Sequence, residues 1–298
     1  MYNVRLATIG MFDGVHKGHL YLLRQALDEA RRLGLESMVV TFSEHPRTML
    51  KGSSEKLLTT LDERRNRLAA TGIDHVCILD FSQIHTLTAE QFLGYLHEKE
   101  SVTTLLMGYD HHFGSDRLSS IEDYKRAGQR AGVQVLHALP YPETSVGNEP
   151  YISSSLIRKA LEEGLIERAN DMLGYAYSVS GQVVHGKQIG TKIGFPTANL
   201  QLAEANKLIP QKGVYAVQVE LNKRIYRGVM NIGDNPTIEC TPSQTSHIEV
   251  HIIGFEGNLY NQSLRVEFIH RLRDEVHFAS LAALRTQIAA DIQRVAAH

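Results

Sequence analysis

The sequence is poor in cysteine, in charge of one sign and in long apolar runs. Its two cysteines, Cys77 and Cys240, lie far apart and outside any CxxC or Cys/His pattern, so we expect free thiols in a reducing compartment and no structural zinc. The 31 Lys and Arg residues offset 33 Asp and Glu residues without a block of like charge, so we expect no nucleic acid partner. No apolar stretch approaches the ~18 residues of a membrane span, and the N-terminus lacks a secretory signal. We therefore expect a cytoplasmic protein without a membrane partner.

The chain is long enough for two domains. It has 298 residues, of which 43% are apolar and 21% charged, as in ordinary globular proteins with ~150 residues per domain. Helical periodicity gives way to two-residue alternation near residue 177. The predicted domains are therefore residues 1–176 and residues 177–298.

The first half alternates short apolar runs with amphipathic helical patterns. A strand over residues 4–9 is followed by a glycine-rich turn and a helix over residues 20–33, which ends before Gly34, a residue suited to a left-handed cap. Capping boxes that start at Thr60 and Thr88 predict two more helices. Further strands are expected at residues 38–42, 76–79, 104–107 and 133–139. Strands separated by helices predict a doubly wound, mainly parallel α/β sheet, which binds ligands at the C-terminal ends of its strands.

The second half has the texture of a β domain. In residues 247–252 one face carries His247, Glu249 and His251 while the other is aliphatic, and residues 214–221 alternate similarly. Several such strands predict a small antiparallel barrel or sandwich. A closing helix over residues 281–295, capped by Ser280, carries one apolar stripe that we expect to pack against this β domain. The stripe consists of Leu281, Leu284, Ile288, Ile292 and Val295.

A phosphate-binding pattern follows the first strand, where residues 10–19 read GMFDGVHKGH. His16 and His19 are three residues apart, so they share one face of the first helical turn, where free amides and the helix dipole favour an anion. Gly10, Gly14 and Gly18 permit close approach of the backbone to a phosphate. The structural alternative is a tight turn with two surface histidines. HxGH between a strand and a helix resembles the signature of the nucleotidylyltransferase superfamily.

The longer string GxFDGVHxGH resembles the FAD synthetase module of bacterial bifunctional riboflavin kinase/FAD synthetases. Residues 41–47 resemble the family's TFxPHP with Glu44 as a departure, and residues 108–114 resemble GxDFxFG with His111 in place of the common Phe. Residues 152–158 resemble ISSTxIR, although they also suit a plain helix cap. The resemblance implies that His16 and His19 act on the α-phosphate and the leaving pyrophosphate. It implies further nucleotide contacts from Gly10, Phe12, Asp13, Gly14, Gly18, Asp110, Ser154, Ser155 and Arg158.

A second glycine-rich stretch opens the β domain. Residues 181–188 nearly match the phosphate-binding P-loop, but Gln188 replaces the hydroxyl that binds magnesium, and Pro196 follows where a helix would begin. Read onward, the pattern GxxxGxxxGxPTAN resembles the riboflavin kinase signature, whereas the structural alternative is a set of glycine-rich turns. The resemblance implies a barrel fold, Glu249 as catalytic base, and Mg²⁺ held by Thr197 and Asn199. It also implies a flexible flap over the nucleotide, formed by Gly186, Gly190, Lys192, Gly194 and Pro196.

These resemblances cover nearly the whole chain and imply a bifunctional enzyme. Its C-terminal domain would convert riboflavin and ATP to FMN, and its N-terminal domain would convert FMN and ATP to FAD and pyrophosphate, both with Mg²⁺. One alternative is that one domain is a non-catalytic flavin- or nucleotide-binding regulatory module. A different nucleotidylyltransferase is disfavoured by the fused kinase signature, and an aminoacyl-tRNA synthetase by the short, near-neutral chain. The sequence predicts no oligomeric state.

Overall fold

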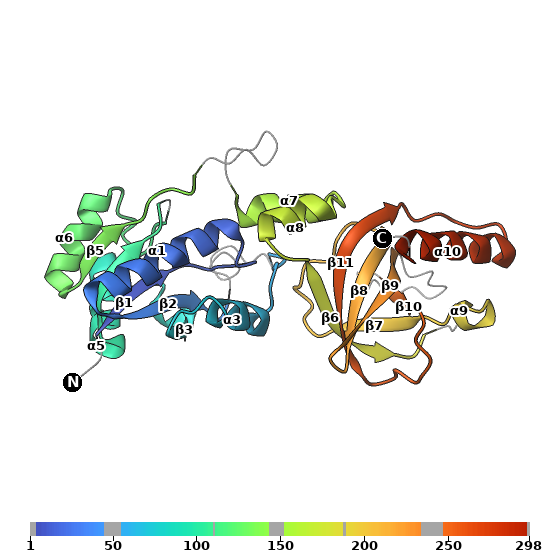
Figure 1. Ribbon diagram of the computed structural model, residues 1–298. Helices are drawn as coiled ribbons and strands as arrows, with labels where there is room; N and C mark the ends of the chain where they lie inside the picture. The colour runs from blue at the N-terminus through green and yellow to red at the C-terminus, as the bar shows by residue number, and fades with distance from the viewer. Residues whose placement is uncertain are drawn as a thin grey trace. The chain divides into compact units, whose positions relative to one another are not determined.

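The computed structural model describes residues 4–44, 55–109, 111–142, 152–186, 189–233 and 247–296. It divides into two compact units, Met1–Ser154 and Ser155–His298 (Figure 1). The boundary between the units lies before residue 177, where the sequence changes from helical periodicity to two-residue alternation. The reason is that helices α7 (Ser154–Glu162) and α8 (Ile166–Leu173) group with the second unit. The Asn170 amide on α8 donates to the Phe268 carbonyl at 2.9 Å. Helix α8 is therefore held by strand β11 (Ser263–Arg273) of the second unit.

The first unit contains a parallel five-stranded sheet in the order β3-β2-β1-β4-β5, which confirms the predicted doubly wound fold. The strands are β1 (Arg5–Ile9), β2 (Glu36–Phe42), β3 (His75–Leu79), β4 (Val102–Met107) and β5 (Gln134–His137). The chain runs outward from β1 in one direction and then returns to β4 on its other side. The C-terminal ends of β1 and β4 therefore form the switch point at which such sheets bind ligands.

The helices of this unit begin where side chains satisfy free backbone amides. Thr60 and Thr88 form the predicted capping boxes, and Gly34 ends the first helix with φ 67°. The first helix begins at Lys17, earlier than predicted, because the His16 side chain caps it. The helices are α1 (Lys17–Leu33), α3 (Leu61–Ala69), α4 (Phe81–Ile84), α5 (Ala89–Glu100) and α6 (Ile121–Ala131).

Helices cover both faces of the sheet. On one face Ala7 and Val40 pack with Phe92 of α5 and Tyr124 of α6. On the other face the strand residues pack with α1 and α3, as shown by Val39 with Leu23 and Leu68 and by Leu6 with Ala26 and Ala30. Alternate side chains of each strand thus enter opposite cores, as expected for a sheet buried on both sides.

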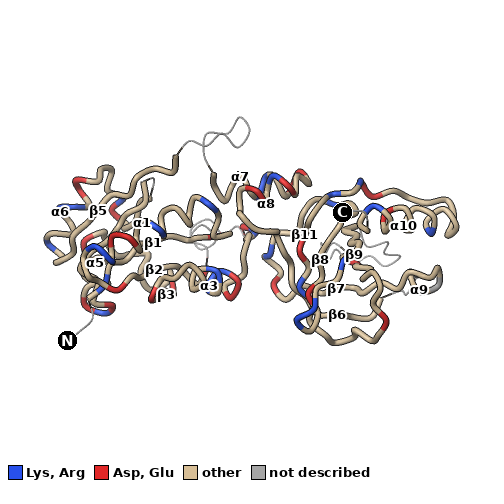
Figure 2. Tube along the Cα trace, in the orientation of Figure 1, with Lys and Arg blue, Asp and Glu red and all other residues tan. Residues whose placement is uncertain are grey.

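The sequence has few cysteines, no long apolar run and no block of like charge, and each feature can be followed in the structure. Cys77 is a free thiol, and burial together with the nearby Glu100 raises its pKa to about 11, so it stays protonated and unreactive. Cys240 lies outside the described residues. In the described ranges no helix has the length and apolar character needed to cross a bilayer. Lys and Arg residues are interspersed with Asp and Glu residues in both units (Figure 2).

The second unit contains a closed antiparallel barrel in the order β10-β7-β6-β11-β8-β9, which decides between the predicted barrel and sandwich. On β10, Ile248, Val250 and Ile252 are buried, whereas the residues between them are half-buried, as the alternation predicts. A short helix, α9 (Ile189–Lys192), lies within the glycine-rich segment that we expected to be a loop. The strands are β6 (Ser178–Val184), β7 (Ala198–Leu202), β8 (Gly213–Leu221), β9 (Arg224–Gly233), β10 (His247–Ile252) and β11 (Ser263–Arg273).

The closing helix α10 (Leu281–Ala296) is most deeply buried near its C-terminal end, where it packs on the barrel, and Leu284 and Ile288 are half-buried. Val295 is buried and Ile292 partly buried against β8 and β9, but Leu281 is 57% exposed, so the predicted apolar stripe is wrong at its N-terminal end. The predicted cap is confirmed, since Ser280 Oγ accepts from the Ala283 amide at 3.2 Å. An ion pair between Arg273 of β11 and the fully buried Asp291, with contacts at 2.8 and 3.0 Å, fixes the C-terminal half of the helix instead.

Candidate active sites

The first candidate site is the loop between β1 and α1. The loop turns sharply, with positive φ angles of 51° at Phe12, 84° at Gly14 and 39° at Val15. The Val15 amide donates to the Phe12 carbonyl at 3.0 Å and closes the turn. A Cβ atom at Gly10 would lie 3.1 Å from the Phe12 ring, so glycine keeps the entry of the loop open. The loop thus delivers the start of α1 to the C-terminal end of β1.

His16 and His19 lie together at the N-terminus of α1. His16 Nδ1 accepts from the His19 amide at 3.3 Å, so the His16 ring carries its proton on Nε2. The two rings stack with their centroids 3.6 Å apart. A Cβ atom at Gly18 would lie 3.2 Å from the His16 ring, so a larger residue there would press on the ring. This pair confirms the shared face that the three-residue spacing predicts.

The His19 side chain is half-buried, with one ring nitrogen shielded from solvent. Its Nδ1 atom is buried and has no hydrogen-bond partner among the described residues. Burial, with a smaller contribution from His16, holds the pKa of His19 well below its usual value. The site therefore offers neutral N–H donors next to the positive end of a helix dipole, an arrangement that can stabilise charge developing on a phosphate.

Ser154 connects the two predicted phosphate-binding stretches of the first half, residues 10–19 and residues 152–158. Its Oγ donates to the Asp13 carbonyl at 2.9 Å, and the Ile152 carbonyl lies 3.5 Å from the Cβ position of Gly18. Two stretches that are distant in sequence therefore meet at the start of α1. Ser155 and Arg158 follow on α7 in the second unit, where Arg158 is buried, and Asp110 lies outside the described residues.

Asp13 and Phe12, both predicted as nucleotide contacts, have structural partners. The buried Asp13 carboxylate accepts from the amides of Leu58 and Thr59 at 3.0 and 2.9 Å and from the Thr59 hydroxyl at 3.0 Å. Phe12 is buried in the core below α1. These contacts fix the loop, and a direct nucleotide contact of either residue remains a prediction.

Arg64, which belongs to none of the sequence motifs, lies under the same loop. Its fully buried guanidinium donates to the Phe42 carbonyl at the end of β2 and lies 3.4 Å from Met11 Sδ. An arginine at this depth is unusual. Its burial could have been predicted from its position four residues before Leu68, which places both residues on the buried face of α3.

His111 lies just beyond the C-terminal end of β4, on the other side of the switch point. Its amide donates to the Gly108 carbonyl at 3.1 Å, and its ring stacks near Phe113. The Nε2 atom is buried without a hydrogen-bond partner in the described part of the chain. Burial, together with His112, lowers the pKa of His111 to about 4, so the ring is neutral near pH 7. A neutral imidazole thus occupies the place of the Phe that the resembled motif carries.

The second candidate site lies in the barrel, where the glycine-rich segment covers β7. Asn199 on β7 pairs with Val184 of β6 and with Glu249 of β10. A Cβ atom at Gly186 would lie 2.0 Å from Asn199 Nδ2, and one at Gly190 would lie 3.2 Å from Thr197 Oγ1. Both glycines therefore lie directly against the predicted metal ligands. A Cβ atom at Gly190 would also lie 2.3 Å from the Phe195 carbonyl, and one at Gly186 would displace the Asn199 side chain.

Three oxygen-bearing side chains meet below this segment. Thr197 Oγ1 donates to Glu249 Oε2 at 3.4 Å, and the buried Asn199 Oδ1 has no partner among the described residues. Mg²⁺ prefers oxygen ligands, so this set fits the ion. His251 Nδ1 donates to the Pro196 carbonyl at 2.8 Å and fixes the start of the PTAN segment. Gly194 has a φ of 89°, and the Lys192 side chain lies outside the described part.

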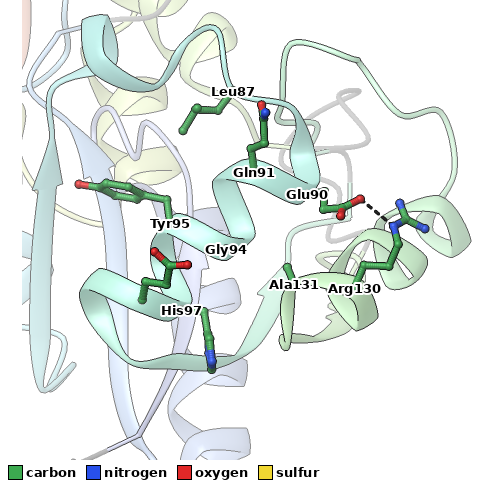
Figure 3. A pocket seen from close by; sticks show the side chains of 9 residues that line it. Leu87, Glu90, Gln91, Gly94, Tyr95, His97, Arg130 and Ala131 are labelled. Atoms are coloured by element: carbon green, nitrogen blue, oxygen red, sulfur yellow. Dashed lines mark hydrogen bonds and ion pairs between the residues drawn. The ribbon is translucent and has the colours of Figure 1, made fainter.

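A surface groove of about 470 Å³ between α5 and α6 contains none of the predicted site residues. Glu90 and Arg130 form an ion pair across it at 2.6 Å, and Tyr95 and His97 line its other side (Figure 3). The groove lies on helices, whereas both candidate sites lie at loops that follow strands. We therefore do not assign the groove to either site.

A tight loop with two stacked histidines at the switch point of a parallel sheet, followed by a barrel with a glycine-covered oxygen cluster, is the arrangement expected of a two-domain phosphate-transferring enzyme. The FAD synthetase family model matches residues 3–155, and the riboflavin kinase family model matches residues 173–298. The chain belongs to the family of bifunctional riboflavin kinase/FMN adenylyltransferases.

Relatives with that name match this chain along nearly its whole length. The one from Pseudomonas fluorescens is 36% identical over 96% of this chain and 90% of its own. The one from Bacillus subtilis is 34% identical over 96% of this chain and 90% of its own. A solved structure described as a macrolide-efflux protein from Streptococcus pneumoniae is 33% identical, with a TM-score of 0.88 over 98% of this chain and 94% of its own. The two-unit architecture is thus shared over the full length.

Proposed function

We propose that this chain phosphorylates riboflavin with ATP to give FMN in residues 177–298 and adenylylates FMN with ATP to give FAD in residues 1–176. The observation that carries the proposal is that each half has its own group of polar side chains, the stacked His16 and His19 in the first and the oxygens of Thr197, Asn199 and Glu249 in the second. The order of the two family models supports this assignment. Because both reactions consume ATP and small flavins, we place them in the cytoplasm.

In the first site, a phosphate oxygen of FMN attacks the α-phosphorus of ATP. The new O–P bond forms as the bond to the bridging oxygen breaks, and pyrophosphate leaves. No side-chain nucleophile is needed, so alignment and charge stabilisation carry the catalysis. His16 and His19 donate to the α-phosphate and the leaving group, and Ser154, Ser155 and Arg158 hold the outer phosphates. The contact between Ser154 and the Asp13 carbonyl supports this grouping.

In the second site, Glu249 accepts the proton of the ribityl 5′-hydroxyl. That oxygen bonds to the γ-phosphorus of ATP while the bond to the β,γ-bridging oxygen breaks, and ADP leaves. Thr197 and Asn199 would hold Mg²⁺, which neutralises phosphate charge when bound, and the unpartnered Asn199 Oδ1 supports this role. The segment with Gly186, Gly190, Lys192 and Gly194 covers the nucleotide.

Two variants of the full chain test both assignments. His19→Ala should stop FAD formation while FMN accumulates from riboflavin. Asn199→Ala should stop riboflavin phosphorylation while supplied FMN is still adenylylated. Both products are measured by chromatography with ATP and Mg²⁺. His85→Ala, at an exposed histidine of the first unit, is the matched control and should keep both activities.

Loss of both reactions in both folded variants would contradict the division of labour. A half that binds its flavin or nucleotide but never turns it over would favour the alternative, a regulatory module. The same assay with other phosphate monoesters in place of FMN tests the substrate of the first site.

A further inference from the structure

The Glu249 carboxylate is held from two sides. His247 Nε2 donates to Oε1 at 2.6 Å, and Thr197 Oγ1 donates to Oε2 at 3.4 Å. His247 and Glu249 are two residues apart on β10 and therefore face the same side of the strand. Both side chains are about 30% exposed, at 30% and 29%. The carboxylate thus has one oxygen directed to the imidazole and the other directed to the predicted metal site.

In the described strands His247 pairs with β9 alone, through Gly233, whereas Glu249 pairs with two strands. Glu249 is flanked by strands on both sides, with Asn231 of β9 and Asn199 of β7 as its neighbours. The backbone of Glu249 is therefore fixed, but its side chain still has rotatable bonds and is set by the hydrogen bonds it accepts. The shorter of these, and the only one from a neighbour on its own strand among those described, comes from His247.

We propose that His247 is a positioning residue for riboflavin phosphorylation. By donating to Oε1, the imidazole turns the carboxylate so that the lone pairs of Oε2 face Thr197 and the substrate hydroxyl. The proton of the ribityl hydroxyl then passes to Oε2 as its oxygen bonds to the γ-phosphorus. This inference rests on the proposed role of Glu249 as base.

Steady-state riboflavin phosphorylation by the full chain tests the inference. In His247→Phe and His247→Leu, kcat should fall roughly 10- to 100-fold, the loss expected for a hydrogen bond to a charged group, while the KM for riboflavin changes less than about threefold. His247→Gln keeps an N–H donor of similar reach and should recover most of kcat. His270→Phe removes another histidine–glutamate pair of the same unit, with Glu167 at 3.0 Å, and should behave like the wild type.

The inference is overturned if His247→Phe and His247→Leu keep the wild-type kcat, or if His247→Gln is as slow as they are. A Glu249→Gln variant separates this failure from failure of the proposed function. If Glu249→Gln keeps the wild-type kcat, the base assignment itself is wrong. If it is slow, adding His247→Phe should cause no further loss, and an additional loss overturns the positioning role.

Discussion

The half-buried imidazole of His111, whose Nε2 atom is shielded from solvent, makes the stability of the first unit depend on pH. Its pKa is about 4 in the folded chain, against an ordinary value of 6.5, because burial and His112 disfavour the protonated ring. The unfolded state therefore binds the proton more readily than the folded state. Stability is unaffected above pH 7, falls as the pH drops through 6.5, and reaches its full loss near pH 4.

His111→Phe should remove this pH dependence, since phenylalanine does not titrate. For pKa values of 6.5 and about 4, linkage gives a loss of ~2 kcal/mol in the wild type between pH 7 and pH 5. A unit of this size shifts its melting temperature by ~2–4 °C per kcal/mol. The melting temperature of the variant relative to the wild type should therefore rise by ~4–8 °C between pH 7 and pH 5.

Differential scanning calorimetry of the full chain at both pH values measures the effect. His85→Gln, at an exposed histidine of the same unit, is the control and should follow the wild type. The reasoning is refuted if the difference between His111→Phe and the wild type is the same at pH 7 and pH 5. That result would mean that the imidazole is protonated as easily in the folded chain as in the unfolded one.

Three further predictions concern single contacts. Gly186→Ala should lower riboflavin phosphorylation at least ~100-fold, because the Cβ of the new alanine would collide with Asn199 Nδ2. FMN adenylylation should continue in this variant, and an equal loss of both reactions would contradict the predicted role of Asn199. Asp291→Asn should lower the free energy of unfolding of the second unit by about 3 kcal/mol in urea titrations, because Arg273 loses its charged partner. A change of less than about 0.5 kcal/mol would show that the ion pair does not hold the helix on the barrel. Asp13→Ala should destabilise the first unit by about 2–4 kcal/mol in the same titration, because three buried hydrogen bonds to its carboxylate are lost. Unchanged stability would contradict the contacts described.

Local patterns predicted most of the helices and strands, including those that carry both candidate sites. The capping boxes at Thr60 and Thr88 and the left-handed Gly34 depend on residues within one helical turn, so they can be read directly from the sequence. The alternation in β10 likewise predicted which side chains share the face with Glu249. Such patterns show which side of an element is buried.

Long-range partners were beyond these patterns. Nothing near Asp13 indicates that its carboxylate accepts from Leu58 and Thr59, and nothing in α8 indicates that Asn170 donates to β11. The exposed Leu281 shows the same limit, because an apolar stripe does not reveal where the surface that covers it ends. The predicted boundary at residue 177 marks a change in hydrophobic periodicity, whereas the boundary after Ser154 depends on which elements pack together.

His16 has two roles, which affects how substitutions in the predicted adenylyl site are interpreted. Its Nδ1 atom caps the N-terminus of α1, and its ring stacks on His19. An alanine at this position would therefore remove the helix cap and the imidazole together. Asparagine would preserve the start of the helix while discarding the ring, which separates loss of architecture from loss of chemistry. Asparagine, rather than alanine, is thus the informative replacement at this position.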